Sequence, residues 1–223
     1  MEIHLHREID RLKEKILGLG AKVEDLLIKA VKAVSEDSTV LANEVIENDK
    51  EIDSLELEVE EDCLKILALH QPVAIDLRYI VAILKINSDL ERIGDLAGNI
   101  AEIVTMKMNA EPKNSIFDFG TMAKLSQEMV RQSLEALVNM NVKLAFEVCE
   151  KDDKVDEMYY EAMEKINSEI TKNPDKARDY IAHLTVYRML ERVGDHATNI
   201  AEDIIYMIEG NIVRHRMEDY DKE

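Results

Sequence analysis

The chain repeats itself, and this duplication constrains its fold more than any other feature of the sequence. Residues 90–102 read LERIGDLAGNIAE and residues 190–202 read LERVGDHATNIAE, so ten of the thirteen positions are identical at a shift of 100. A second pair of similar segments lies upstream, LANEVIENDKEID from Leu41 and LAFEVCEKDDKVD from Leu144, at a shift of 103. The same two motifs in the same order indicate duplication of one unit of roughly 105 residues.

Helix signals divide each unit into three long segments. Glycine (7) and proline (3) are scarce among the 223 residues, and a chain with few breakers and many good helix formers favours helices over strands. We expect six helices, over about residues 6–34, 40–69, 72–107, 119–139, 142–171 and 174–209. Turn and capping residues separate them, and the third helix is expected to begin at Pro72, because proline is favoured in a first helical turn.

Three antiparallel helices of this length make a bundle, and the chain contains two such sets. The sequence therefore predicts an all-α fold of two tandem three-helix bundles related by internal duplication. We expect the first bundle over residues 1–108 and the second over residues 119–210, with a linker over residues 109–118.

Charge and hydropathy exclude several kinds of partner. The net charge of −19 repels phosphate backbones and anionic lipid, so we expect no nucleic-acid partner. The longest strongly apolar run, residues 80–84, is far shorter than the ~18 residues of a membrane span, and the charged N-terminal segment does not resemble a secretory signal. Cys63 and Cys149 are too few for a disulfide framework and are expected to be buried thiols. These features predict a cytoplasmic protein without membrane insertion.

Acidic residues line one face of several helices, nearly opposite the apolar stripe that forms the core. At about 100° per residue, one arc of each unit's third helix carries Glu91, Asp95, Asn99 and Glu102, or Glu191, Asp195, Asn199 and Glu202. The second helix carries Asp49, Asp53, Glu56 and Glu60. On the fifth helix Asp152 and Asp156 match the first two of these acids, but Tyr159 and Met163 replace the last two.

The spacing Glu/Asp-x-x-x-Asp occurs four times in these stripes and places like charges side by side on a helix. Such a pair costs a few tenths of a kcal/mol, and a bridging cation would remove the cost. Carboxylate oxygens suit Mg²⁺, Ca²⁺, Mn²⁺ or iron. Gly94 and Gly194 cost roughly 1 kcal/mol each within a helix, which indicates close approach of a neighbouring helix. The pattern leaves open a metal site or a solvated acidic face, and His196 at its margin is either a ligand or a surface histidine.

Motifs that would indicate catalysis are missing from the sequence. None of the six histidines follows a glutamate at the Glu-x-x-His spacing of a ferritin-like di-iron site. Glycine-rich phosphate loops do not occur either, and local sequence suggests no nucleophile–histidine pairing. We therefore expect a protein that is not an enzyme.

The two motif pairs, with QPVAIDLRYIVAILKINSDLERIGD leading into the first, resemble the PhoU family over nearly the whole chain. Members of that family are accessory regulators of bacterial phosphate uptake. The resemblance implies two three-helix bundles with iron or zinc clusters on their surfaces. It implies metal ligation by these residues, with the two asparagines assisting: Asp49, Asp53, Glu91, Asp95 and Asn99 in one half, and Asp152, Asp156, Glu191, Asp195 and Asn199 in the other.

The resemblance also implies partners and a role. The partners are the phosphate-specific ABC transporter and the phosphate-sensing histidine kinase, and the role is repression of the phosphate-starvation response when phosphate is plentiful. Our hypothesis is a non-enzymatic signalling adaptor, which we expect to be a homodimer because long helices with exposed apolar edges often pair. A metal-dependent phosphate-ester hydrolase is the alternative, and a metal-free helical scaffold is a third possibility.

Overall fold

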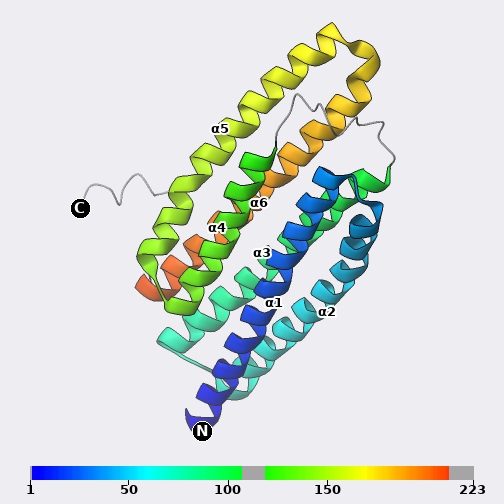
Figure 1. The fold of residues 1–223 in the computed structure, drawn as a ribbon. Coiled ribbons are helices and arrows are strands. Elements are labelled where there is room, and N and C mark those ends of the chain that lie inside the picture. Colours follow the sequence, from blue (N-terminus) through cyan, green and yellow to red (C-terminus); the bar gives the residue numbers. More distant parts are fainter. Residues whose placement is uncertain (1, 107–118, 211–223) are drawn as a thin grey trace, which may run out of the picture.

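The computed structural model describes residues 2–106 and 119–210, and all regular structure in these two ranges is helical. The first unit consists of α1 (Glu2–Glu36), α2 (Thr39–His70) and α3 (Ala74–Thr105). The second consists of α4 (Gly120–Asn139), α5 (Val142–Lys172) and α6 (Ala177–Glu209), with a short 3₁₀ turn, Pro174–Lys176, before α6. Figure 1 shows the long helices running roughly along one common direction.

Side-chain caps start the second helix of each unit at equivalent places. The hydroxyl of Ser38 accepts from the backbone N–H of Leu41, and the amide oxygen of Asn141 accepts from that of Leu144. Each cap satisfies one of the free N–H groups of a helix start. The predicted helix breaks between residues 34 and 40 and between residues 139 and 142 are thereby confirmed.

The third helix begins two residues later than we predicted. Gln71 ends α2 in the left-handed region at a φ of 48°, and its N–H still bonds the Leu67 carbonyl. Pro72 and Val73 then reverse the chain before α3 starts at Ala74. The proline stands in the connection rather than in the first helical turn. Likewise, Pro174 opens the 3₁₀ turn and not α6 itself.

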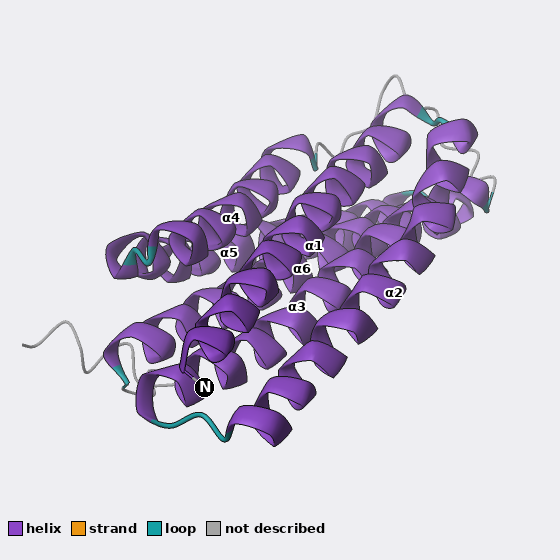
Figure 2. Ribbon diagram, turned by 90° about the horizontal axis from the view of Figure 1, so that it is seen from below, coloured by secondary structure: helices purple, strands orange, loops and turns teal. Residues whose placement is uncertain are grey.

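The helices form two three-helix bundles that share one core. Within each unit every helix packs on the other two, and the units meet where α3 packs on α6 and α1 packs on α4. Figures 1 and 2 show α3 and α6 at the centre of this arrangement. The predicted core stripes are confirmed, because the following residues are all buried: Ile86, Leu90, Ile93, Ala97, Ile100 and Val104 in α3, and Leu190, Val193, Ala197, Ile200 and Ile204 in α6.

The shared core affects how the duplication is understood. The buried apolar side chains of both units belong to one continuous cluster. The predicted division at residues 108 and 119 stays a prediction, since the linker over residues 109–118 lies outside the described residues.

Cys63 and Cys149 are free and buried, as expected, and burial raises the pKa of both thiols to about 12. Among the described helices, none has the length and apolarity needed to cross a membrane.

Candidate metal sites

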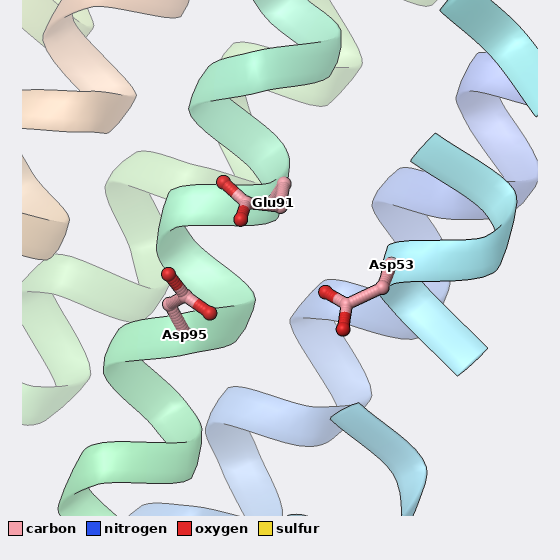
Figure 3. A group of neighbouring side chains, drawn as sticks. All are labelled: Asp53, Glu91 and Asp95. Carbon is pink, nitrogen blue, oxygen red and sulfur yellow. The ribbon is translucent and has the colours of Figure 1, made fainter. Parts of the chain in front are cut away.

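Three carboxylates of the first unit converge between α2 and α3. Asp53 comes from α2, and Glu91 and Asp95 come from successive turns of α3. One oxygen of each lies within 4.8 Å of the others, and Figure 3 shows Asp53 facing the pair on α3. Because i and i+4 side chains share one helix face, a single neighbouring helix suffices to complete the group. We call Asp53, Glu91 and Asp95 the first acidic cluster.

The second unit repeats this arrangement between α5 and α6. Asp156 from α5 meets Glu191 and Asp195 from α6, again with one oxygen of each within 4.8 Å of the others. We call these three residues the second acidic cluster. Both clusters therefore use the positions that the duplication makes equivalent, and six of the ten residues predicted as ligands are brought together in two sets.

Asp49 and Asp152 lie one helical turn before Asp53 and Asp156, and glycines on the facing helix make room for them. A Cβ atom on Gly94 would lie 3.4 Å from Asp49 Oδ1, and one on Gly98 would lie 3.1 Å from Asp49 Oδ2. In the second unit a Cβ atom on Gly194 would lie 3.4 Å from Asp152 Oδ1. The close helix approach predicted from the two equivalent glycines is therefore confirmed.

These two aspartates carry buried oxygens that lack partners. Asp49 Oδ1 and Asp152 Oδ1 are inaccessible to solvent and accept no hydrogen bond within the described part of the chain. An unsatisfied buried carboxylate oxygen costs free energy comparable to a lost hydrogen bond or more. A cation between the two helices would satisfy such an oxygen, so this observation fits a metal better than it fits a solvated face.

The electrostatics of both sites disfavour negative charge in the metal-free protein. Burial, followed by the charges of Asp95 and Asp53, raises the pKa of Asp49 to about 6. Burial, followed by the charges of Asp195 and Asp156, raises the pKa of Asp152 to about 6, and the Thr198 hydroxyl beside this carboxylate opposes part of the rise. Burial is also the largest cause that raises the pKa of Glu91, Asp156, Glu191 and Asp195. A bound cation acts in the opposite direction and favours the ionised form.

Local basic residues compensate these acids only weakly. The guanidinium of Arg92 lies 3.5 Å from a carboxylate oxygen of Glu91 and 3.5 Å from one of Asp95. The Arg92 side chain is 56% exposed, so solvent screens both contacts. The residual negative charge of the first acidic cluster is what a multivalent cation would balance.

The two predicted asparagine ligands have different surroundings. The Asn199 amide donates to Asp89 Oδ1 at 3.3 Å, across the contact between α6 and α3. His196 Nδ1 lies 2.8 Å from the same oxygen. Asn99 lines a hollow between α3 and α6. Asp89 thus joins the two units, a role that periodicity along α3 did not reveal.

The first site has a polar extension that the second lacks. Asn87 is only 1% exposed and donates to the backbone oxygen of Glu56 at 2.9 Å and to its Oε1 at 3.2 Å. The pKa of Glu91 is raised mainly by burial, and the negative charge of Glu56 raises it further. Tyr159 and Tyr187 stand at the equivalent places in the second unit. The difference on the fifth helix was visible in the sequence, but the buried asparagine that holds Glu56 was not.

The donor set consists of oxygen atoms. Carboxylates suit hard cations such as Mg²⁺, Ca²⁺ and Mn²⁺ and also suit iron, whereas structural zinc sites usually include Cys or His. His196 already pairs with Asp89, and Cys63 and Cys149 are buried as thiols. Both acidic clusters could therefore hold a metal ion through oxygen ligands.

Comparison with known proteins agrees with this architecture. The family described as PhoU domain matches residues 16–104 and again residues 119–204. A phosphate-specific transport system accessory protein PhoU homolog of Aquifex aeolicus is 37% identical over 95% of this chain and 96% of its own length. The accessory protein PhoU of Escherichia coli is 29% identical over 93% of this chain and 86% of its own length.

Solved structures show the same fold. The crystal structure of PhoU from Pseudomonas aeruginosa superposes with a TM-score of 0.88 at 33% identity, covering 92% of this chain and 99% of the other. The phosphate transport system regulatory protein PhoU from Streptococcus pneumoniae superposes with a TM-score of 0.86 at 29% identity, covering 94% and 99%. The two bundles and their mutual packing are thus those of these proteins.

Proposed function

This chain belongs to the PhoU family, and we propose that it is a non-enzymatic regulator of phosphate uptake that holds metal ions in its two acidic clusters. Its named relatives are accessory or regulatory proteins of phosphate transport. The observation that carries the metal part of the proposal is the convergence, in both units, of three carboxylates beside a buried aspartate oxygen without a partner.

The residues that would hold the metal follow from this placement. Asp49, Asp53, Glu91 and Asp95 form the first set. Asp152, Asp156, Glu191 and Asp195 form the second. In this proposal Asn99 and Asn199 assist, and Asn199 does so by releasing Asp89. The all-oxygen ligands favour iron over zinc among the metals that the family resemblance implies.

Partner binding is the step by which such a protein would regulate transport. We propose that the metal-loaded acidic clusters dock onto the phosphate-specific ABC transporter and the phosphate-sensing histidine kinase, and so repress the phosphate-starvation response. A bound metal ion lowers the negative charge of an acidic cluster, which otherwise repels acidic surfaces of a partner. Docking therefore depends on metal binding. The proposed location is the cytoplasm. The proposed assembly is a homodimer, and light scattering on the purified protein would test this assembly.

Replacement of one ligand in each cluster tests the proposal. Protein carrying Asp95→Ala and Asp195→Ala is compared with wild type by elemental analysis after purification without metal-affinity resin. A matched control carries Asp25→Ala and Glu135→Ala, which remove two exposed acids of α1 and α4 that pair with neighbouring lysine or arginine. We expect at least a tenfold loss of bound metal in the first variant only, with loss of binding to membranes that contain the transporter.

Two outcomes would contradict the proposal. Equal metal content in all three proteins would remove the metal sites. Turnover of a phosphate ester by the metal-loaded wild type, lost in the Asp95 and Asp195 variant, would instead indicate the hydrolase alternative.

A further inference from the structure

A hollow of about 240 Å³ lies between the C-terminal half of α3 and the N-terminal half of α6, outside both acidic clusters. Apolar side chains form most of its wall: Ile103, Met106, Ile181, Ala182 and Met189. Ile181 is 55% exposed and Met106 is 62% exposed, so part of this apolar wall faces solvent. A concave apolar surface of this kind gains free energy when a ligand covers it.

The internal duplication supplies a second copy of the same place, and there polar side chains pair across the contact. In the contact between the N-terminal half of α3 and the C-terminal half of α6, Lys85 Nζ lies 3.0 Å from Asp203 Oδ1. The same ammonium lies 5.4 Å from the centre of the Tyr206 ring. Asp89 accepts from Asn199 beside them. Long polar side chains with mutual contacts thus occupy this half of the α3–α6 contact.

At the hollow, these polar residues have shorter or apolar counterparts at a shift of 100. Thr185 stands for Lys85, Ile103 for Asp203, Met106 for Tyr206 and Met189 for Asp89. The Thr185 hydroxyl donates to the Ile181 carbonyl of its own helix and so does not reach across to α3. The two halves therefore differ: one holds polar pairs across α3 and α6, and the other holds an apolar hollow.

One cation stands at the rim of the hollow. Arg178 lines it, and no ion pair of Arg178 is found within the described residues. Glu102 also lines the hollow, and its charge is one of the causes that raise the pKa of Asp49 on α2. In a chain of net charge −19, a guanidinium beside an apolar wall favours an anionic group at that one position.

We propose that this hollow binds a small amphipathic anion, with its apolar body against Ile103, Ile181 and Met189 and its carboxylate at Arg178. An apolar cavity of about 150 Å³ holds benzene, so this hollow accepts a body of about six to eight carbons. Such a ligand bridges α3 and α6, the two helices that join the units. The hollow lies outside both acidic clusters and, given the proposed function, adds a second input to a regulator of phosphate uptake.

Titration of the purified protein with octanoate by isothermal calorimetry, in the presence of a chelator, tests this proposal. We expect one octanoate per chain with a Kd of about 0.1–1 mM. Arg178→Gln should weaken binding about tenfold, because the carboxylate loses its charged donor. Arg131→Gln is the matched control, since Arg131 is an exposed arginine of α4 that pairs with Glu135. It should leave binding unchanged.

Filling the hollow is the complementary test. Ala182→Leu adds apolar volume to the wall and keeps a good helix former. The double change Thr185→Lys with Ile103→Asp copies the polar pair of the other half. Both variants should lose octanoate binding while circular dichroism shows an unchanged helix content. Absence of binding to the wild type, unchanged binding by Ala182→Leu, or equal binding by Arg178→Gln and wild type would overturn the proposal.

Discussion

Gly94 and Gly194 show how much a single missing side chain contributes to the candidate sites. Each lies within a long helix, where alanine would be more stable, and each faces the helix that carries an aspartate with a buried, unpartnered oxygen. The glycine lets two backbones approach until that oxygen lies between them. Under the proposed function, a cation between the helices accounts for both the cost of the glycine and the cost of the oxygen without a partner.

Replacement of Gly94 by alanine should therefore weaken the first metal site alone. The new Cβ would lie 3.1 Å from Ile52 Cγ2 and 3.4 Å from Asp49 Oδ1, and Ile52 is buried, so α2 and α3 must separate slightly. We expect a several-fold loss of metal affinity at one of two sites in calorimetric titration. Gly18→Ala is the control, because a Cβ at Gly18 meets nothing within 4 Å. Equal affinities in the two variants would argue against this role of Gly94.

The raised pKa values of Asp49 and Asp152 predict how pH affects the metal-free protein. Each pKa rises from 3.8 in the unfolded chain to about 6 in the fold, so the folded state binds more protons between those values. The free energy of unfolding therefore falls as pH rises from about 4 to about 6 on account of these two groups. Asp49→Asn with Asp152→Asn should be more stable than wild type at pH 7 by about 1 kcal/mol or more, after allowance for screening.

Thermal denaturation in chelator at a series of pH values measures this effect. The stability difference between the Asn variant and wild type should be small at pH 4 and grow up to pH 7. Asp25→Asn, at an exposed aspartate of α1, is the control and should show no such growth. With metal present the order should reverse, since the variant loses ligands. A difference that is independent of pH would contradict the assignment.

At the scale of elements, the acids on α2 and α5 reach their partners because both helices start at a defined residue. Ser38 and Asn141 cap these starts, and the caps lie 11 residues before Asp49 and Asp152, at equivalent positions. A helix in a given register then carries Asp53 and Asp156 to the face that meets the third helix of each unit. The caps and the acidic stripes therefore belong to one inherited element.

Removal of either cap should destabilise the fold to a similar extent. Ser38→Ala and Asn141→Ala should each lower the free energy of unfolding in urea by about 1 kcal/mol, because a helix-start N–H loses its acceptor. Ser54→Ala is the control, since Ser54 is an exposed residue within α2 whose hydroxyl donates to the Lys50 carbonyl. That change should be neutral or slightly stabilising. Equal effects at all three serine and asparagine positions would show that the caps contribute nothing specific.

At the scale of the whole molecule, α3 and α6 join the two units through polar contacts in one half and an open hollow in the other. Asp203 is 3% exposed at its side chain and pairs with Lys85 of the other unit. A buried ion pair is weak evidence for stability, but removal of Lys85 deprives the buried Asp203 carboxylate of this ammonium group. The equivalent pair, Thr185 and Ile103, contains no charge at all.

This asymmetry leads to a prediction for the inter-unit contact. Lys85→Met should lower the free energy of unfolding by about 3 kcal/mol, whereas Lys85→Thr with Asp203→Ile, which copies the other half, should recover most of that loss. Lys22→Met, at an exposed ion pair with Glu51, is the control and should stay within about 0.5 kcal/mol. Chemical denaturation gives all three values. A neutral Lys85→Met would mean that the pair does not stabilise the contact.

Periodicity along the chain was enough to predict the helices, the core stripes and the acidic stripes. These features depend on residues within about a turn or two of one another, and a regular helix converts such spacing directly into a face. For that reason the spacing alone pairs Glu91 with Asp95 and Glu191 with Asp195. The start of α3 was misplaced by two residues, because the left-handed Gln71 places Pro72 in the connection and a proline signal alone cannot show this.

The tertiary structure alone decided what faces each stripe. It placed Asp49 against Gly94 and Gly98 and turned Asn199 and His196 toward Asp89. It also packed α3 on α6 so that one half of their contact holds polar pairs and the other holds a hollow. His196 and Asn199 lie 107 and 110 residues from Asp89 in the chain. Contacts between such distant residues depend on how whole helices pack and on the volumes of the side chains between them. Spacing within a single helix determines a face but does not determine its neighbour.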